Sequence, residues 1–591
     1  MKTYLLNIAL IVLVVVIIQG HSLSAGLLLD DNNHRAELRE GDWSFRSLVG
    51  ASHLGDPRRR VRMWWQDEAD LFFFRPLSFA LMRAEYVVGG WRPSVMHVFS
   101  LAWAVACASL VMVLGRAAGL RASWVLLAGV LFALHPGNAM TVRWLACQNQ
   151  QMVMFFVLAA LWFYGRWSRW QWRGNRTDSG GGSPFYLMGA LLCAVAAMGC
   201  RESGVVLVPL LVVGDYVARP ARMRGRWPVY ILLGFVLMAY FVLRHAAIGP
   251  FSMPVRPYAY PPSSPGFLRF VVDKFFYYVL SLVVQIPIVG FAGLRFLRSQ
   301  PMLFYGGFAF VVAVWAALLR WLRPRRIIWL FLAMATLPLM PVLPVFASSH
   351  HLYSASAGVV LAGVMLGQMF WDRLAGRVDR AARWGRGLVV GLIILHVVGY
   401  TAANAMHGIG LDGFSAASRL PVEEVVQLAG PLKPGDRLFF INLPPLGFNC
   451  MPAIEEARGV SPLRGYVLTF ASSLMRMNQP SNIERVGTHG LRVRQDGDGY
   501  FSGLQGRSML EAIGRSNPFE VGSRFVTDDF SVEVIRADER GIQEFLFTFN
   551  RPLSDPTYHF FFGSPGFSAY PVIFNVMPDH DPGYPETDTS S

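Results

Sequence analysis

The fold is decided by residues 94–137, which read SVMHVFSLAWAVACASLVMVLGRAAGLRASWVLLAGVLFALHPG. Two apolar runs, each close to the length of a membrane-spanning helix, flank a short turn that carries Arg116 and Arg121. The whole chain repeats this pattern: its 591 residues are 53% hydrophobic and only 15% charged, whereas a soluble globular protein carries about 25% charge. The sequence therefore predicts a polytopic α-helical membrane protein with some soluble mass attached.

Residue usage excludes several classes of protein. The net charge is +15, but lysine occurs only as Lys2, Lys274 and Lys433, and none of them follows a glycine as a Walker A loop requires. The 5 cysteines include no C-x-x-C pair, which excludes zinc ribbons and thioredoxin motifs. In a polytopic chain a basic excess is typical of inner loops and lipid phosphates, so we expect a membrane partner and no nucleic acid.

Eleven apolar segments are predicted to span the membrane: 4–20, 94–115, 122–137, 149–165, 184–200, 202–217, 228–247, 303–319, 327–346, 354–370 and 387–406. The first could also be a signal peptide, because residues 22–25 (SLSA) resemble a cleavage site. We interpret it as a retained span, since the residues just beyond it look functional. The stretch 267–300 is interpreted as a re-entrant or interfacial hairpin that is broken at Pro287.

Arginines decide which side each loop occupies, because inner loops are rich in Lys and Arg. Counting 267–300 as a full span would leave Arg295 and Arg298 inside and would put a larger group outside, namely Arg320, Arg323, Arg325, Arg326, Arg373, Arg377, Arg380, Arg383 and Arg386. The hairpin interpretation instead predicts an inner amino end and an outer carboxyl end. The Arg-rich, Lys-poor usage and the lack of eukaryotic targeting signals favour a bacterial inner (cell) membrane with the outer face in the periplasm.

Two soluble parts are predicted on the outer face. Residues 21–93 form a first outer loop in which Trp43, Trp64 and Trp65 stand among charges, as is typical of juxtamembrane helices in the interface. Residues 407–578 form a mostly β or α+β domain, with strands at 437–443, 465–470, 491–494, 530–536 and 544–549. Residues 579–591 are Pro-rich and acidic and are predicted to be disordered.

Adjacent carboxylates follow the first span at Asp30 and Asp31, with His34 one turn further on. Two carboxylates near a membrane surface repel each other and cost desolvation. One use for them is a general base for an acceptor hydroxyl or amine, and the other is to hold a divalent cation such as Mg²⁺ or Mn²⁺. The alternative to both functions is a purely structural one, a solvated turn that an Asp side chain caps. Whether a metal takes part stays open.

Cationic groups recur at the outer ends of the predicted helices. Arg75 is flanked by Phe and Pro, which places it to fork onto a phosphate or simply to extend to the interface. His135 precedes a Pro that ends a span, where it either binds phosphate or caps carbonyls. Arg201 and Glu202 stand between two apolar runs, as an anion site or as an internal pair that fixes the turn. The same outer cavity is predicted to include Arg244, Lys274, His350 and His351.

The motifs in this order resemble membrane glycosyltransferases of the GT-C superfamily. The similar stretches are 30–31 (DD), 74–77 (FRPL), 131–136 (LFALHP) and 200–203 (CRES) followed by apolar residues to Asp215. The nearest branch holds the transmembrane O-mannosyltransferases with tetratricopeptide repeats and their bacterial relatives. The likeness covers roughly residues 1–400. This chain departs from the branch by carrying Arg201 where the family has Lys, residues 350–354 (HHLYS) where it has RYLYLP, and no tetratricopeptide repeats.

The resemblance implies an enzyme that transfers a hexosyl or pentosyl sugar from a polyprenyl-phosphate donor. Transfer would occur on the outer face by direct displacement with inversion, with Asp30 or Asp31 as the base. Arg75, His135, Arg201 and Glu202 would line the donor phosphate site. The acceptor is a protein, glycan or lipid, and the sequence does not choose among them.

Two other classes of function stay open. A polytopic transporter would place its charges near the membrane midplane and would often show repeated halves, but here the charges cluster at one face. A membrane-anchored sensor or scaffold would not require acidic and basic groups at several outer helix ends. A shared pocket formed by the acidic pair and these cations would favour the enzyme.

Overall fold

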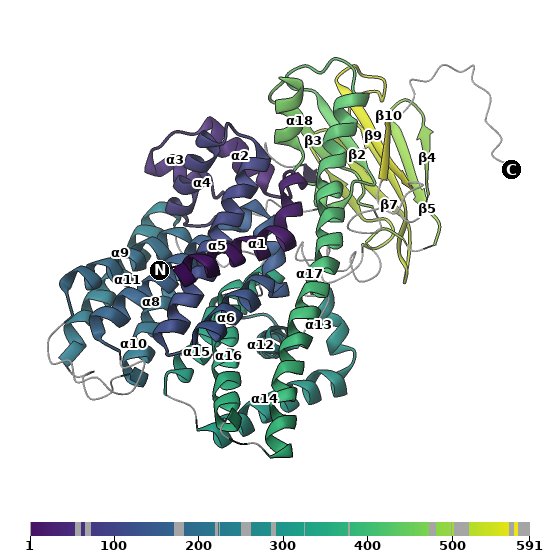
Figure 1. Cartoon of the computed structure of the whole chain (residues 1–591). Coiled ribbons are helices and arrows are strands. Elements are labelled where there is room, and N and C mark those ends of the chain that lie inside the picture. Colours follow the sequence, from purple (N-terminus) through teal and green to yellow (C-terminus); the bar gives the residue numbers. More distant parts are fainter. Residues whose placement is uncertain are drawn as a thin grey trace. The chain divides into compact units, whose positions relative to one another are not determined.

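The computed structural model describes residues 2–53, 61–65, 72–170, 182–218, 223, 225–249, 260, 262–284, 291–323, 326–375, 377, 379–471, 480–497, 499–501, 519–565 and 572–576. It divides into two compact units (Figure 1). The first comprises Met1–Leu54 and Asp70–Asp412, and the second comprises Gly55–Ala69 and Gly413–Ser591. The predicted tail at 579–591 lies outside the described residues.

The first unit is helical. Its long elements are α1 (Lys2–Gln19), α5 (Pro93–Ala117), α6 (Ala122–Leu134), α8 (Gln148–Ser168), α9 (Pro184–Cys200), α10 (Leu207–Ala218), α11 (Trp227–Ile248), α14 (Pro301–Leu322), α15 (Ile328–Thr336), α16 (Tyr353–Ala375) and α17 (Arg380–Leu428). Every apolar segment predicted as a span overlaps one of these helices. Among the described residues, 7 helices are long and apolar enough to cross a membrane, or up to 8 if α6 and the segment Pro136–Arg143, bent by 52°, form one span.

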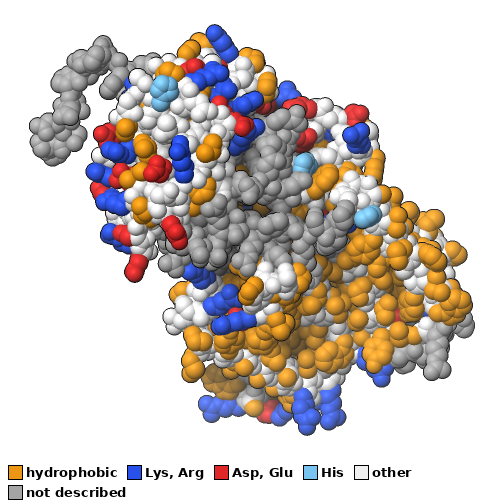
Figure 2. Space-filling view, turned by 180° about the vertical axis from the view of Figure 1, so that it is seen from behind, with side chains coloured by type: hydrophobic (Ala, Val, Ile, Leu, Met, Phe, Trp, Pro, Cys, Tyr) orange, Lys and Arg blue, Asp and Glu red, His pale blue; other side chains and the backbone are white. Residues whose placement is uncertain are grey.

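Short elements connect the long helices and contain or directly adjoin most of the polar residues predicted to be functional. They are η1 (Gly20–Ser24), α2 (Asp31–Glu40), α3 (Phe45–Gly50), α4 (Pro76–Val88), η2 (Pro136–Asn138), α7 (Ala139–Arg143), η3 (Leu145–Cys147), η4 (Glu202–Val206), η6 (Leu337–Val342) and η7 (Ser349–Leu352). Figure 2 shows that hydrophobic side chains cover a broad face of this unit and that Lys and Arg side chains border it. That surface suits a multi-pass membrane protein, whose lipid-facing side chains are apolar.

Close helix packing depends on small residues in this unit, as is usual between membrane helices. Gly358 of α16 lies against α15, where an added Cβ would come within 2.3 Å of the Ala335 nitrogen and 2.5 Å of the Phe331 carbonyl oxygen. The two backbones are therefore in direct contact, which any larger residue at 358 would prevent.

The predicted hairpin segment forms two separate helices, α12 (Phe267–Val283) and α13 (Phe291–Arg298). Asp273 of α12 holds them to α14, because it accepts hydrogen bonds from Arg298 Nε at 2.8 Å and from the Tyr305 hydroxyl at 2.9 Å. Pro287, the predicted break, lies outside the described residues.

The second unit contains two five-stranded sheets. The first has the order β1-β3-β2-β9-β10, in which β1 (Arg62–Met63), β3 (Arg464–Val467), β2 (Arg437–Ile441) and β9 (Tyr558–Pro565) run parallel and β10 (Val572–Val576) is antiparallel. The second is antiparallel, in the order β4 (Ser481–Val486), β5 (Gly490–Gln495), β8 (Gly541–Phe549), β7 (Phe530–Asp538) and β6 (Arg524–Val526). With helix α18 (Met451–Arg458), this confirms the predicted combination of membrane helices and a carboxyl-terminal sheet region.

One segment of the first outer loop differs from its prediction. Trp64 and Trp65 were expected in the membrane interface, but they are only 8% and 3% exposed in the core of the second unit. The Trp64 indole donates to the Leu468 carbonyl at 2.9 Å and packs edge-on against Phe545. Burial of these large rings beside β1 explains why the segment belongs with the β-sheets.

Candidate active site

The acidic pair stands at the start of α2. Asp31 is 1% exposed, and its Oδ2 accepts from the Leu28 amide at 2.9 Å while its Oδ1 accepts from the Ala146 amide at 2.6 Å. Burial raises the pKa of Asp31 to about 8, with a smaller contribution from the charge of Asp30. Asp31 therefore ties α2 to the segment that precedes α8, while Asp30 is half-buried.

His34 is buried beside this pair and is neutral at neutral pH. Burial, with a smaller contribution from the charge of Arg75, lowers its pKa to about 4. Its Nδ1 donates to the Ala51 carbonyl at 2.9 Å, and its ring packs edge-on against Phe79. His34 therefore holds α2 against α3 and α4.

The charges at the predicted turn pair across elements. Glu202 of η4 accepts from Arg75 Nε at 3.0 Å and from the Phe74 amide at 3.2 Å. The Arg75 guanidinium also lies over the Phe73 ring, 4.1 Å from its centre. Arg201 instead donates to Asn149 Oδ1 at 2.5 Å. The two charged residues of the turn thus also contact other elements, Arg201 through Asn149 of α8 and Glu202 through Arg75 at the start of α4.

These groups converge on the start of α8. Asp30, Asp31, Arg75 and Arg201 all lie close enough to the buried Cys147 to act on it electrostatically. The acidic pair and two guanidinium groups are thus brought together from α2, α4 and η4. Distant parts of the sequence supply one cluster of opposite charges.

His350 and His351 adjoin the same cluster. Arg201, Arg75 and Lys274 act on both rings electrostatically. His350 Nδ1 bonds the Ser348 hydroxyl at 2.7 Å, and His351 Nδ1 bonds the Tyr278 hydroxyl at 2.8 Å. The two rings contact each other with their centres 4.2 Å apart. Both buried rings therefore border the arginine side of the cluster.

Lys274 is held by backbone carbonyls. Its side chain is 0% exposed and donates to the carbonyls of Val342, Val345 and Phe346, the last at 3.0 Å. Three donations match the three N–H groups of an ammonium. Lys274 therefore fixes the segment that leads into His350 rather than presenting its charge to a ligand.

Arg244 and His135 complete the predicted set. Arg244 is buried on α11, and it acts with Glu202 and Arg75 on Tyr240, so it borders the cluster. His135 instead caps η2: its Nδ1 accepts from the Gly137 amide at 3.2 Å. The His135 ring packs edge-on against Tyr400 of α17. Its Nε2 also contacts the Leu282 carbonyl at 3.3 Å, and phosphate binding by His135 stays a prediction.

A row of amides at the start of α8 was not predicted. Residues 148–151 read QNQQ, and all four side chains are buried. Asn149 holds Arg201, Gln150 donates to the Ser354 hydroxyl at 2.9 Å, and Gln148 donates to Glu85 at 2.8 Å. Four successive polar residues at the mouth of an apolar run are costly in a membrane helix, and this was the signal available in the sequence.

Glu85 of α4 is the buried acid in this network. Burial raises its pKa to about 7, against hydrogen bonds from Trp103 and Gln148. Because the folded protein holds this proton more tightly than the unfolded chain, the associated stability is complete below the ordinary pKa of 4.5 and is lost as the pH rises through about 7.

We expect Glu85→Gln to remove this pH dependence. The Gln148 amide oxygen has no partner in the described residues, so an amide flip lets it accept from the new side chain. Relative to the wild type, the variant should gain up to about 3 kcal/mol between about pH 5 and about pH 8. Thermal melting at several pH values measures this, and parallel curves for the two proteins would contradict it.

No group of three or more His, Cys, Asp or Glu side chains arranged to hold a metal ion occurs among the described residues. No family model matches the chain, and no curated protein matches it. Several solved structures are similar to it, among them two of ArnT and one of an oligosaccharyltransferase. ArnT from Cupriavidus metallidurans in the apo state has a TM-score of 0.41 at 14% identity, covering 77% of this chain and 84% of that one.

The same ArnT bound to undecaprenyl phosphate has a TM-score of 0.39 at 15% identity, covering 77% of this chain and 85% of that one. The oligosaccharyltransferase of Archaeoglobus fulgidus, tethered to an acceptor peptide, has a TM-score of 0.41 at 10% identity, covering 79% of this chain and 64% of that one. The activity of the present chain is therefore a proposal that rests on the geometry of its own site.

Proposed function

We propose that the chain is a membrane glycosyltransferase that moves a sugar from a polyprenyl-phosphate donor to an acceptor. The observation that carries this proposal is that Asp31 accepts from the Ala146 amide while Arg201 donates to Asn149, three residues further along the chain. Glu202, the residue after Arg201, holds Arg75 beside them. Guanidinium groups bind phosphate with paired donors, and a carboxylate beside them can accept a proton from the nucleophile. The surrounding apolar helices suit a donor that carries a long lipid chain.

Asp30 is assigned as the general base. It is half-buried, whereas Asp31 is buried with both oxygens accepting backbone amides. Because the pKa of Asp31 is raised, its protonation relieves the repulsion between the neighbouring carboxylates. Asp30 then keeps the charge that a base needs.

The proposed reaction is a single displacement with inversion. The acceptor oxygen or nitrogen bonds to the anomeric carbon while its proton passes to Asp30. The bond between that carbon and the phosphate oxygen breaks at the same time, and the electron pair leaves on the polyprenyl phosphate. Arg75 and Arg201 stabilise the charge that develops on this leaving group, and Glu202 holds Arg75 in position.

The location of the reaction is part of the proposal. We place the site on the outer, periplasmic face of a bacterial inner membrane, as the arginine distribution along the sequence predicts. The acceptor is a protein, glycan or lipid of that compartment. A hexosyl or a pentosyl group fits this chemistry equally well.

The test is donor binding and turnover by the reconstituted full chain. Polyprenyl-phosphate hexose and pentose donors are supplied, and the release of polyprenyl phosphate is measured. Arg201→Gln should weaken donor binding about 10- to 100-fold, because a charge-assisted hydrogen bond is worth about 1.5–3 kcal/mol. Arg166→Gln, at the far end of α8, is the matched control and should bind as the wild type does. Equal binding by both variants would contradict the proposal.

A further inference from the structure

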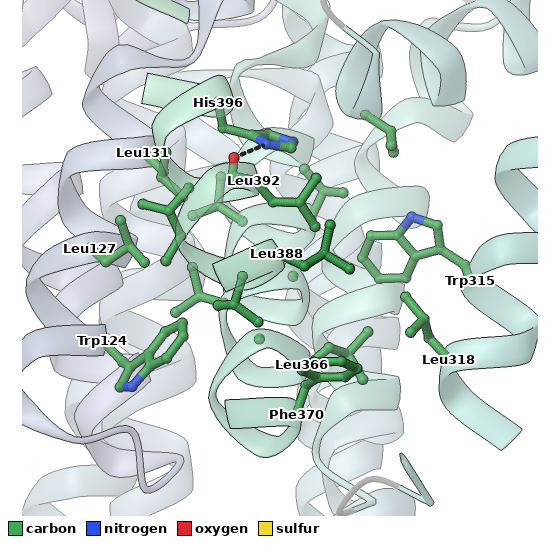
Figure 3. Close-up of a pocket in the computed structure, with 18 of the residues that line it drawn as sticks. Trp124, Leu127, Leu131, Trp315, Leu318, Leu366, Phe370, Leu388, Leu392 and His396 are labelled. Atoms are coloured by element: carbon green, nitrogen blue, oxygen red, sulfur yellow. Dashed lines mark hydrogen bonds between the residues drawn. The ribbon is translucent and has the colours of Figure 1, made fainter. Parts of the chain in front are cut away.

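An apolar pocket lies between α6, α14, α16 and α17, apart from the charged cluster. It is a pocket of about 350 Å³ whose walls include Trp124, Leu131, Trp315, Phe370, Leu388 and His396 (Figure 3). This volume falls in the usual range for ligand pockets. No Asp, Glu, Lys or Arg is among the described residues that line it. Its occupant must therefore be apolar along most of its length.

A basic hollow adjoins one end of this pocket. Arg320, Arg323 and Arg373 line it together with Trp321 and Trp329, and no carboxylate is among its described lining residues. Three positive charges with interfacial aromatic rings match the headgroup level of an anionic lipid. The hollow thus supplies a site for a phosphate and excludes a cationic ligand.

The two sites share a wall. The Arg373 guanidinium donates to the Trp321 carbonyl at 2.8 Å and lies over the Trp321 ring, 5.1 Å from its centre. Trp321 in turn contacts Phe370, with ring centres 5.3 Å apart, and Phe370 lines the apolar pocket. A single molecule with an anionic head and an apolar chain can therefore occupy both.

We propose that this composite site binds an anionic glycerophospholipid. The phosphate lies among Arg320, Arg323 and Arg373, and an acyl chain enters the pocket beside Trp315. A free phosphate would leave the apolar pocket unused, and a zwitterionic lipid would bring a cation among three arginines. The charge of the hollow and the apolar walls of the pocket therefore select one class of ligand. This inference is independent of the proposed sugar transfer.

The first test removes the charge of the hollow. The full chain, purified in mild detergent, is offered equal amounts of phosphatidylglycerol and phosphatidylcholine, and retained lipid is measured by native mass spectrometry. The triple variant R320Q/R323Q/R373Q should retain phosphatidylglycerol at least about tenfold less well than the wild type. Retention of phosphatidylcholine should not change.

A matched variant controls for total charge. R46Q/R116Q/R166Q removes three arginines that do not line the hollow, so it should retain phosphatidylglycerol as the wild type does. Thermal melting of all variants verifies folding. Equal retention of the two lipids by the wild type, or unchanged selectivity in R320Q/R323Q/R373Q, would overturn the proposal.

The second test fills the pocket. Gly363 lines it, and a Cβ added there meets no atom within 4 Å, so Gly363→Phe can enter the space without a backbone clash. It should lower retention of phosphatidylglycerol about tenfold, because the acyl chain loses its place. Gly234→Phe on α11, where a Cβ is equally free, is the control. Full retention by Gly363→Phe would show that the headgroup alone binds and would overturn the assignment of the acyl chain.

Discussion

Asp30→Asn is expected to lower sugar transfer by about 10²- to 10⁴-fold, the usual contribution of a general base. The amide cannot accept the acceptor's proton, but it keeps the size and polarity of the carboxylate. The Asp30 side chain does not cap α2, so the substitution removes no cap. The measurement is the rate of polyprenyl-phosphate release at saturating donor. Binding of the donor should change little, because the arginines remain.

Two neighbouring acids act as controls for Asp30. Asp42→Asn alters an exposed carboxylate in the same loop and should leave turnover within about twofold, since no proton transfer depends on it. Asp31→Asn should act mainly on thermal stability, because both Asp31 oxygens accept backbone amides. If Asp31→Asn lost turnover while Asp30→Asn kept it, the roles of the two acids would be reversed. Full turnover in both variants would remove the base from the mechanism.

The pattern of apolar residues predicted the elements of the fold far better than it predicted their partners. Helix α5 matches the apolar run at 94–115 because a membrane span must be predominantly apolar over about 20 residues. Strand β7 alternates buried and half-buried residues through most of its length, which is the period that marks a strand in sequence. Such local signals need no knowledge of distant contacts.

The contacts that decide function are long-range. Glu202 follows Arg201 directly, yet it pairs with Arg75, 127 residues earlier in the chain. Lys274 was predicted to be one of the positive groups of the outer cavity, and its ammonium donates to three backbone carbonyls. Sequence spacing carries neither fact, since both depend on how helices are placed in space.

The short β1 segment illustrates the same limit in the second unit. Tryptophans among arginines are typical of a membrane interface, and Trp64 and Trp65 follow Arg62 closely. Strand β1 pairs with β3 through Arg62 and Tyr466, about 400 residues later in the chain. A two-residue strand with so distant a partner leaves no periodic signal to find.

Asp215→Ala is expected to destabilise the helical unit by about 3–5 kcal/mol, as breaking one partner of a buried ion pair does. Asp215 is 0% exposed near the end of α10. One oxygen accepts from Ser168 at 2.7 Å, Trp170 at 2.7 Å and Arg226, and the other accepts from Tyr164 at 2.6 Å and Tyr230 at 2.8 Å. These donors come from α8, the residues just beyond it, and the start of α11. Removing the carboxylate takes the shared acceptor away from all of these donors, among them the buried Arg226 guanidinium.

Thermal melting in detergent measures this loss, and two variants make the result specific. The double variant D215N/R226Q removes both charges, so it should recover part of the stability lost in Asp215→Ala, because no buried charge then lacks a partner. Asp372→Ala breaks the exposed pair with Arg121, whose side chains are 44% and 54% exposed respectively, and should cost no more than about 1 kcal/mol. If Asp215→Ala and Asp372→Ala had the same melting temperature, the Asp215 carboxylate would not be what joins α8, α10 and α11. A double variant no more stable than Asp215→Ala would locate the loss in the hydrogen bonds of Tyr164, Ser168, Trp170 and Tyr230 rather than in the unpaired Arg226.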